Sequence, residues 1–498
     1  MRFRGLLLVA SLLVAGVAAT LVVVERPDRA QPVATVRAPA SELEAVPSAP
    51  PASPEPAAPE PPPRDHGELR QRLLAIVDRP DLEVASPLGI AVLDERGDEV
   101  LAVDADQAML PASTNKLLTA AGAMLALGPE HTFQTRVVAD GPISDRGTVV
   151  GDLTLVGSGD PSLSTDDYHR WIYPARPWTS LDALADDLVA AGLRRVIGSV
   201  VGDGTTFQGP TDASGWKDEY LQDLNARHVT GLTVDAGLRW WIDTPPPDVA
   251  LEIHRADDPV LEAAMALERL LEARGVHVTG RPEAAVEPTT ASNVLAAVES
   301  PPLSQILTHT LQRSDNHMAD MLLPSLGLVG RGRGTWVDGS LALREILRQA
   351  DVDLTGLLVD DGSGLSRNNR VTSRQLAAID AHLAASYGET WSSMLAVLGE
   401  TGTLRGRLRG TIAEGRFAGK TGTLDDVVAV VGHVTGSDGE RYHLAVMGND
   451  LRGGDRWKTY VLMDELILAL VAHLDGCRLV APSPAPSPSE PYRSATSC

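Results

Sequence analysis

Two serine–lysine pairs in the chain have the spacing of a nucleophile and its base. Serine attacks a carbonyl only when a neighbouring group takes its proton, and a lysine three residues later on a helix shares its face. This spacing occurs at Ser113-Thr-Asn-Lys116 and at Ser214-Gly-Trp-Lys217. The first pair opens an apolar run that predicts a buried helix, whereas the second contains a glycine and no such run follows it. We therefore interpret Ser113 as the nucleophile and Lys116 as its base.

A second polar triplet, Ser314-Asp-Asn316, interrupts a predicted apolar helix that spans residues 302–326. In an acyl-transfer site, Ser314 can relay a proton between an amine and the leaving group, and Asn316 can hydrogen-bond a substrate amide. Taken alone, the triplet also fits a solvated helix turn or cap. Its significance depends on what accompanies it.

The third triplet, Lys420-Thr421-Gly422, falls in a predicted strand over residues 416–424. A basic residue, a hydroxyl and a glycine at a strand edge can bind a carboxylate and let it approach closely. Lysine is rare in this chain, because arginine supplies nearly all of its 43 basic residues. Ser-x-x-Lys, Ser-x-Asn and Lys-Thr-Gly in this order are typical of a serine acyl-transfer enzyme.

The set of triplets resembles the signature of penicillin-binding proteins and serine β-lactamases. Three further segments are similar to the class C low-molecular-mass penicillin-binding proteins, the D-Ala-D-Ala carboxypeptidase/endopeptidase family: Gly159-Asp-Pro-Ser-Leu163, Asp361-Gly-Ser-Gly-Leu-Ser-Arg367 and Gly402-Thr-Leu-Arg405. Two positions depart from the family pattern. Asp320 stands where the family usually has glutamate, and the segment from Leu232 has aspartate where it tends to have asparagine.

The resemblance implies a role for each matched residue. Ser113 would be acylated, with Lys116 as its base. Ser314 would act as relay and Asn316 as substrate contact, while the Lys-Thr-Gly strand would bind the substrate through Lys420 as electrostatic partner, Thr421 at the substrate carboxylate, and Gly422. The backbone N–H groups of Ser113 and Thr423 would form the oxyanion hole. It also implies peptidoglycan stem peptides as substrates, β-lactams as covalent inhibitors, and no cofactor or metal.

Two other functions remain alternatives at this stage. A serine β-lactamase would use the same nucleophile and base, but it must also hydrolyse its acyl-enzyme rapidly, and the sequence identifies no dedicated deacylating carboxylate. A catalytically silent cell-wall-binding protein on the same fold is disfavoured by three intact triplets. The sequence does not separate carboxypeptidase from endopeptidase activity, and it leaves the oligomeric state open.

The elements that must position these residues form a predicted α+β fold. β-Runs near both ends of the globular body suggest one antiparallel sheet closed by the two termini, with helices in the middle. The resemblance identifies this as a penicillin-binding or β-lactamase-like transpeptidase domain carrying an inserted α/β module. The expected strands are residues 88–94, 99–103, 416–424, 427–435 and 442–449, and the expected helices include 113–127, 302–326, 336–349, 373–385 and 457–474.

Changes in composition divide the chain into five predicted parts. These are a signal peptide or membrane anchor (1–26), a Pro/Ala-rich linker (27–64), a discontinuous catalytic domain (65–144 and 296–477), an inserted module (145–295), and a Pro/Ser-rich tail (478–498). Arg2 and Arg4 before an uncharged stretch indicate export, so we expect an extracytoplasmic protein that is either secreted or anchored to the plasma membrane.

Charge and cysteine content exclude several other classes. The net charge of -23 opposes binding to nucleic acid or anionic lipid. The chain's 2 cysteines, Cys477 and Cys498, lie at its C-terminal end, so a thiol nucleophile or a Cys-rich zinc site in the body is excluded. Whether these two cysteines pair is left open.

Overall fold

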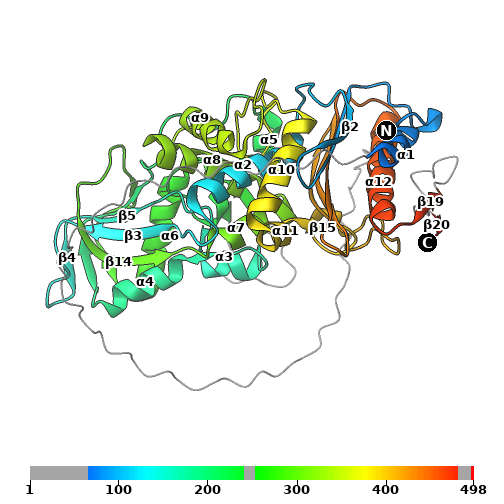
Figure 1. Ribbon diagram of the computed structural model, residues 1–498. Coiled ribbons are helices and arrows are strands. Elements are labelled where there is room, and N and C mark those ends of the chain that lie inside the picture. Colours follow the sequence, from blue (N-terminus) through cyan, green and yellow to red (C-terminus); the bar gives the residue numbers. More distant parts are fainter. Residues whose placement is uncertain (1–65, 241–252, 481–494, 498) are drawn as a thin grey trace, which may run out of the picture. The chain divides into compact units, whose positions relative to one another are not determined.

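A six-stranded antiparallel sheet carries the Lys-Thr-Gly triplet on one of its strands (Figure 1). The computed structural model describes residues 66–240, 253–480 and 495–497. Strands from both ends of the body meet in this sheet, because β1 pairs with β18 along its whole length. The predicted antiparallel sheet, closed by the two termini, is confirmed. Its strand order is β15 (Ala396–Val397), β16 (Phe417–Leu424), β17 (Val427–Thr435), β18 (Arg441–Gly448), β1 (Leu88–Asp94) and β2 (Glu99–Val103).

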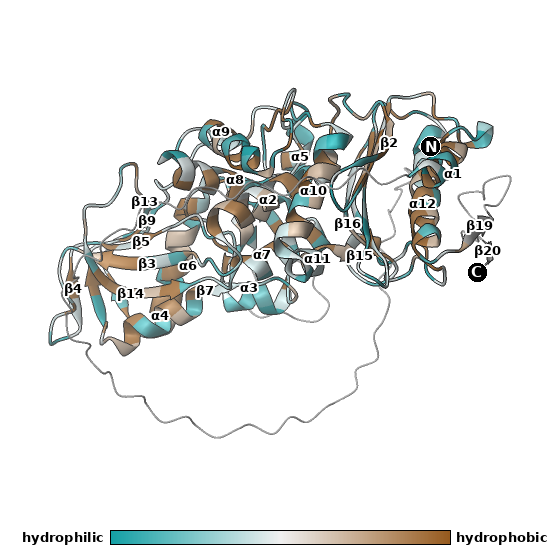
Figure 2. Ribbon diagram, viewed as in Figure 1, coloured by the Kyte–Doolittle hydropathy of each residue, from teal (hydrophilic) through white to brown (hydrophobic). Residues whose placement is uncertain are grey.

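Strand β17 shows why this sheet needs helices on both faces. Its residues alternate between two hydrophobic cores: Ala429 and Val431 lie in one, and Val428 and Val430 lie in the other. The second core also contains residues of two helices, α1 (Gly67–Val77) near the N-terminal end of the body and α12 (Asp455–Leu474) near its C-terminal end. Figure 2 shows α12 as a largely hydrophobic helix.

The first core is built by the helices of the middle segment, which carry most of the site. These are α2 (Asn115–Leu127), α7 (Leu303–Arg313), α8 (Asn316–Arg331), α9 (Trp336–Leu347), α10 (Ser373–Tyr387) and α11 (Glu389–Met394). The prediction of one helix over residues 302–326 is wrong. Ser314 ends α7 in the left-handed region, at φ 60°, and the Asp315 side chain caps α8 by accepting from the Met318 N–H.

The nucleophile also lies just outside its predicted helix. A short 3₁₀ turn, η2 (Ala112–Thr114), carries Ser113, and α2 begins at Asn115. Ala112 has a positive φ of 49°. The bend that this requires directs the chain from the preceding loop into a buried helix, so Ser113 stands at the helix entrance.

A second α/β region lies between α2 and α7. A mixed five-stranded sheet, in the order β13-β9-β5-β3-β14, extends from Gln134 to Glu299, so it includes strands on both sides of the predicted insert boundaries. The division into domains stays a prediction. The strands of this sheet are β3 (Gln134–Ala139), β5 (Leu153–Val156), β9 (Val200–Asp203), β13 (Glu283–Ala284) and β14 (Asn293–Glu299), and the main helices packed on it are α4 (Leu181–Ala190) and α6 (Pro259–Ala273).

The remaining strands and α-helices are short. They are β4 (Thr148–Val150), β8 (Arg195–Ile197) and β12 (His277–Val278) in a parallel three-stranded sheet, the pairs β6 (Leu163–Ser164) with β7 (Thr179–Ser180), β10 (Leu238–Trp240) with β11 (Ile253–Arg255) and β19 (Arg478–Val480) with β20 (Ala495–Ser497), and the helices α3 (Asp166–Trp171) and α5 (Asp218–Gln222).

Several sequence predictions concern residues that the structure does not describe. Three predicted segments lie outside the described residues: the whole signal or anchor (1–26), the whole linker (27–64) and most of the tail (478–498). Within the described ranges, no helix combines the length and apolar character that a membrane span requires. Cys477 is disulfide-bonded, and Cys498 lies outside the described residues.

Candidate active site

The side chains of Ser113 and Lys116 are in direct contact at the start of α2. Ser113 is partly exposed, whereas Lys116 has no exposed surface. The Lys116 Nζ lies 3.1 Å from the Ser113 Oγ, 2.7 Å from the Asn316 Oδ1 and 2.7 Å from the carbonyl oxygen of Ser363. The first two triplets and the Asp361–Arg367 segment therefore meet at one amine.

Burial changes the protonation of that amine. Removal from water lowers the pKa of Lys116 to about 8, against the opposing attraction of Asp320, Asp361 and Asp315. Burial, reinforced by Asp361, raises the pKa of the Asp320 carboxyl well above its usual value. A lysine with a pKa near 8 is neutral often enough at physiological pH to accept a proton.

The break between α7 and α8 places the Ser-Asp-Asn triplet in the site. Ser314 is the residue in the left-handed conformation at the break. Its Oγ accepts a hydrogen bond of 2.9 Å from the Lys420 Nζ. Asn316 is the first residue of α8, where its Oδ1 faces Lys116 and its Nδ2 donates to the Asn225 carbonyl at 2.9 Å. The triplet thus bridges the two lysines.

Strand β16 supplies the other wall of the site. Because β15 pairs only with Gly419 and Ala418, the part of β16 from Lys420 onward forms an edge of the sheet. Thr421 is partly exposed and Thr423 is exposed on this edge. An open edge of this kind can hydrogen-bond an extended peptide through its backbone.

Lys420 is as fully buried as Lys116. Its Nζ donates to Ser314 and, at 2.8 Å, to the carbonyl oxygen of Thr421. Burial lowers the pKa of Lys420 well below its ordinary value, and the neighbouring Lys116 lowers it further. An anionic group bound beside it would favour its protonated form.

Close backbone approach explains two glycines of the site. A Cβ on Gly422 would lie 2.7 Å from the Pro111 carbonyl oxygen, so glycine lets β16 approach the nucleophile turn. Gly364 has a φ of +88°, and a Cβ there would lie 1.8 Å from the Ala112 carbonyl oxygen. Both glycines hold neighbouring segments against the turn that carries Ser113.

The segment from Asp361 to Arg367 is both a turn and part of the site. The Asp361 carboxylate accepts from the backbone N–H groups of Gly364 and Ser366 and from the Trp216 indole. The Asp320 carboxylate accepts from the N–H groups of Gly362 and Ser363. These bonds fix the carbonyl oxygen of Ser363 against Lys116.

Sequence reasoning missed three contacts of the site. Asn225 holds Asn316, the Thr403 hydroxyl accepts from that of Thr421 at 2.8 Å, and the Tyr460 hydroxyl lies 3.3 Å from that of Thr423. The match at residues 402–405 gave a signal for Thr403. Nothing in the sequence distinguishes Asn225 or Tyr460 from other polar residues.

The competing Ser-x-x-Lys pair is not assembled. The Ser214 Oγ donates to Asp360 at 2.8 Å, and the Lys217 Nζ pairs with Glu219 at 2.9 Å. Their polar atoms are thus engaged with different partners, as the glycine within the spacing predicted.

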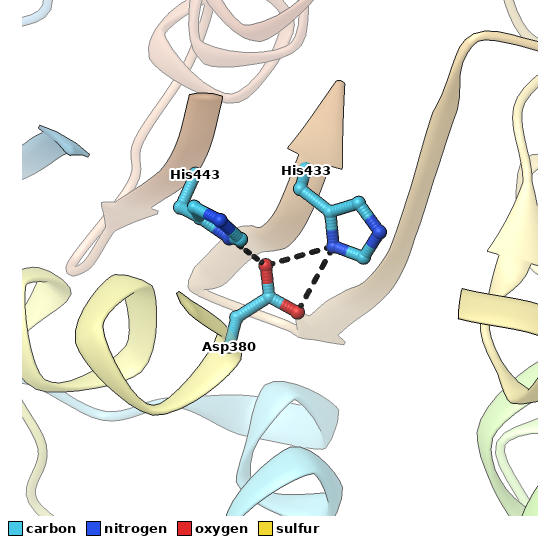
Figure 3. Close-up of side chains that lie close together, drawn as sticks. All are labelled: Asp380, His433 and His443. Atoms are coloured by element: carbon cyan, nitrogen blue, oxygen red, sulfur yellow. Dashed lines mark hydrogen bonds and ion pairs between the residues drawn. The ribbon is translucent and has the colours of Figure 1, made fainter. Parts of the chain in front are cut away.

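Among the described residues, only Asp380, His433 and His443 gather ligand-type atoms closely enough for a metal (Figure 3). Both His Nδ1 atoms contact the Asp380 carboxylate, at 3.0 and 2.7 Å, and the Trp391 Nε1 donates to it at 2.9 Å. These separations are those of direct hydrogen bonds. The cluster belongs to the packing between α10 and the sheet, and the acyl-transfer chemistry does not involve it.

Comparison with known proteins agrees with this geometry. The model of the D-Ala-D-Ala carboxypeptidase 3 (S13) family matches residues 69–245 and 247–467. The chain belongs to this family. It is a serine-type D-Ala-D-Ala carboxypeptidase, and its fold is the α+β fold of the low-molecular-mass penicillin-binding proteins, with the extra α/β region described above.

Individual relatives cover most of the chain. A D-alanyl-D-alanine carboxypeptidase of Actinomadura sp. (strain R39) is 33% identical over 75% of this chain and 79% of its own length. Carboxypeptidase DacB of Mycolicibacterium smegmatis is 30% identical over 82% of this chain and 86% of its own length. The crystal structure of penicillin-binding protein 4 from Haemophilus influenzae covers 82% of this chain and 99% of its own, with 21% identity and a TM-score of 0.67.

Proposed function

We propose that Ser113 is the acylated nucleophile of this S13 peptidase and that it cleaves D-Ala-D-Ala or D-Ala cross-links in peptidoglycan stem peptides. The observation that carries the proposal is the contact of one buried amine, Lys116, with Ser113, Asn316 and the Ser363 carbonyl. Two of these partners only accept hydrogen bonds. A neutral Lys116 donates its two N–H groups to them, so its lone pair points to the Ser113 hydroxyl.

Acylation follows from this arrangement. The Ser113 Oγ attacks the D-Ala carbonyl carbon while Lys116 takes the hydroxyl proton. The backbone N–H groups of Ser113 and Thr423 stabilise the tetrahedral oxyanion. The C–N bond then breaks, the proton that Lys116 accepted passes through the Ser314 hydroxyl to the leaving amine, and an ester remains on Ser113.

Hydrolysis of that ester completes the cycle. Water attacks the acyl carbon while Lys116 accepts its proton. The bond between the acyl carbon and the Ser113 Oγ then breaks, Lys116 returns the proton to Oγ, and the shortened peptide leaves as a carboxylic acid. The side chain of Thr421 contacts the carboxylate of the substrate, and that carboxylate favours the protonated form of Lys420. Lys420 would then balance the negative charge of the bound peptide.

β-Lactams should react at the same serine. The Haemophilus influenzae penicillin-binding protein 4 has been solved in complex with a β-lactam. A strained lactam carbonyl would form the same ester with Ser113, but its leaving group stays tethered. We further propose that the protein works outside the cytoplasm, where its substrate lies, delivered by the N-terminal apolar segment.

Intact-mass measurement with benzylpenicillin tests the nucleophile. The expected result is a mass increase of one drug molecule in the unmutated chain and none in Ser113→Ala. Lys217→Ala is the matched control, because its amine pairs with Glu219 outside the site, and it should be acylated normally. Rapid drug turnover without an adduct would indicate a β-lactamase, and acylation of Ser113→Ala would refute the assignment.

A further inference from the structure

A small recess adjoins the catalytic residues on the side of the helix break. It is a cavity of about 180 Å³ lined by Ser314 and Asn316 together with Arg227, Arg313 and His309. Ser314 also contacts Lys420, and Asn316 contacts Lys116, so a ligand in the recess would lie next to the reacting groups. The catalytic mechanism described above uses none of the three basic residues.

The recess carries an excess of positive charge. Within the described part of the chain, the exposed guanidinium of Arg313 has no hydrogen bond or ion pair. Arg227 donates one long bond of 3.4 Å to the Ala236 carbonyl, while its buried Nε has no acceptor in the described structure. Polar N–H groups are seldom left buried without an acceptor, so an anionic group would complete this site.

The lining of the recess has one acid for two arginines. Asp315 is the acidic residue among those that line the recess, and its carboxylate lies 3.8 Å from the Nε of Arg176 and 3.5 Å from the Nε2 of His309. It also caps α8. Arg176 is 3% exposed and is not part of the lining. Burial opposes ionisation of Asp315, but the charges of Arg176 and Arg227 hold the pKa of its carboxyl well below the ordinary value. Asp315 therefore balances only part of the positive charge of the recess, and a ligand carboxylate would balance the rest.

We propose that this recess binds a carboxylate of the wall peptide and that Arg313 and Arg227 are specificity-determining residues. The proposal rests on the function proposed above, because that function places the peptide beside Ser314 and Asn316. Guanidinium groups bind carboxylates through paired, charge-assisted hydrogen bonds. In a chain with a net charge of -23, a local cationic site is also what an anionic peptide needs in order to approach.

The carboxylate could come from either side of the scissile bond. Ser314 is the expected relay to the leaving amine and lines the same recess as Arg313, so a carboxylate on the leaving residue is one source. Asn316 also lines the recess and is the expected contact of a substrate amide, so a carboxylate on the residue before D-Ala is the second source. The chemistry is the same in both cases, and matched substrates separate them.

The test compares peptides that differ only in one carboxylate. One pair has D-Glu or D-Gln as the leaving residue, and the other has Glu or Gln immediately before D-Ala. The readout is the ratio of kcat/KM within each pair for the full chain. We expect the unmutated protein to prefer the carboxylate in one pair, and Arg313→Gln and Arg227→Gln to reduce that ratio about tenfold.

Two further variants separate recognition from structure. Arg313→Lys keeps the charge and should retain part of the preference. Arg348→Gln removes an exposed arginine outside the recess, in η4 (Arg348–Ala350), and should leave both ratios unchanged. If Arg313 served only as a cation at the C-terminus of α7, its replacement would lower stability without changing either ratio.

Acylation by benzylpenicillin, measured on the same preparations, reports on the function itself. Unchanged ratios in Arg313→Gln together with normal acylation would overturn the recess and leave the proposed function intact. Failure of the unmutated chain to form an adduct would overturn both. If the arginine variants lose the preference for the carboxylate in the leaving-residue pair, the recess binds the leaving group. If they lose it in the other pair, the recess binds the acyl side.

Discussion

At the scale of single residues, the protonation of Lys116 decides whether Ser113 can react. Its amine faces two acceptor-only oxygens and one hydroxyl. In the protonated form all three contacts are donated by lysine, and no lone pair remains for the serine proton. Only the neutral amine can act as a base.

The rate of acylation should therefore rise with pH. Burial lowers the pKa of Lys116 to about 8, so the neutral fraction increases about tenfold per pH unit below that value and levels off above it. The second-order rate constant for benzylpenicillin, measured between pH 6 and pH 9.5, should show this limb. A flat profile over the whole range would contradict the assignment of Lys116 as the base.

The residue types of the site could be inferred from the sequence, but some of their partners could not. Ser113, Lys116 and Lys420 were identifiable because their chemistry is tied to short spacings. The Ser363 carbonyl and Asn225 contribute backbone oxygens, and backbone atoms carry no residue-type signal. Such contacts depend on how loops distant in sequence pack together.

At the scale of elements, the site depends on turns that only certain residues can adopt. The apolar periodicity on both sides of Ser314 predicted one long helix, but the chain turns there with a positive φ. Periodicity reports which residues are buried, and it continues through a break when both helices pack on the same core. The polar triplet itself was the signal of the break, since Asp315 is a strong N-cap residue.

Gly364→Ala should damage both stability and acylation. The added Cβ would lie 1.8 Å from the Ala112 carbonyl oxygen at a backbone φ of +88°, so the turn must move. We expect the free energy of unfolding to fall by at least about 3 kcal/mol. The displaced Ser363 carbonyl should also slow acylation.

Gly406→Ala is the matched control for this change. A Cβ there has no atom within 4 Å. Its free energy of unfolding should change by less than about 1 kcal/mol. Urea unfolding and benzylpenicillin acylation measure both effects, and equal behaviour of the two variants would contradict the close-approach argument.

The Asp380 cluster should stabilise the junction of α10 with the sheet (Figure 3). His433 and His443 face each other on β17 and β18, and both contact the same carboxylate. Asp380→Asn replaces an acceptor oxygen by a donor that faces other donors. A buried donor left without its acceptor costs about 1–3 kcal/mol, which urea unfolding at pH 7.5 should detect.

The same cluster should make the fold sensitive to acid. Burial lowers the pKa of His443, so the unfolded chain takes up this proton first and stability falls as the pH drops below about 6.5. Burial opposes ionisation of Asp380, but His433 and His443 hold its pKa below the ordinary value, so its contribution is lost at still lower pH. Asp380→Asn should flatten the lowest part of this profile, and an unchanged profile would refute the linkage.

At the scale of the whole molecule, the two ends of the body are coupled through the sheet. β1 and β2 precede the nucleophile, β16 to β18 follow the rest of the site, and β1 joins β18. The sequence predicted this closure because strand patterns appear at both ends with helices between them. The second α/β region has short strands broken by glycine and proline, so its edges could not be placed from the pattern alone.

The N-terminal helix should be essential to this closure even though it lies far from Ser113. Leu69 and Leu73 of α1 are buried in the core shared with α12, and burial of each such side chain contributes about 2 kcal/mol. Arg79 also donates a 2.9 Å hydrogen bond to Glu465, which has no exposed surface. Removal of the chain through Arg79 would expose one face of α12 and also take the guanidinium away from that carboxylate.

A chain beginning at residue 66 keeps α1 and Arg79, and it serves as the reference for urea unfolding and for acylation. A chain beginning at residue 84 loses α1 and Arg79, and it should unfold at a clearly lower concentration or fail to accumulate as a folded protein. Arg79→Met in the full-length chain separates the two contributions, because it removes the guanidinium and keeps the helix. Equal stability of the two truncated chains would show that the sheet closes without α1.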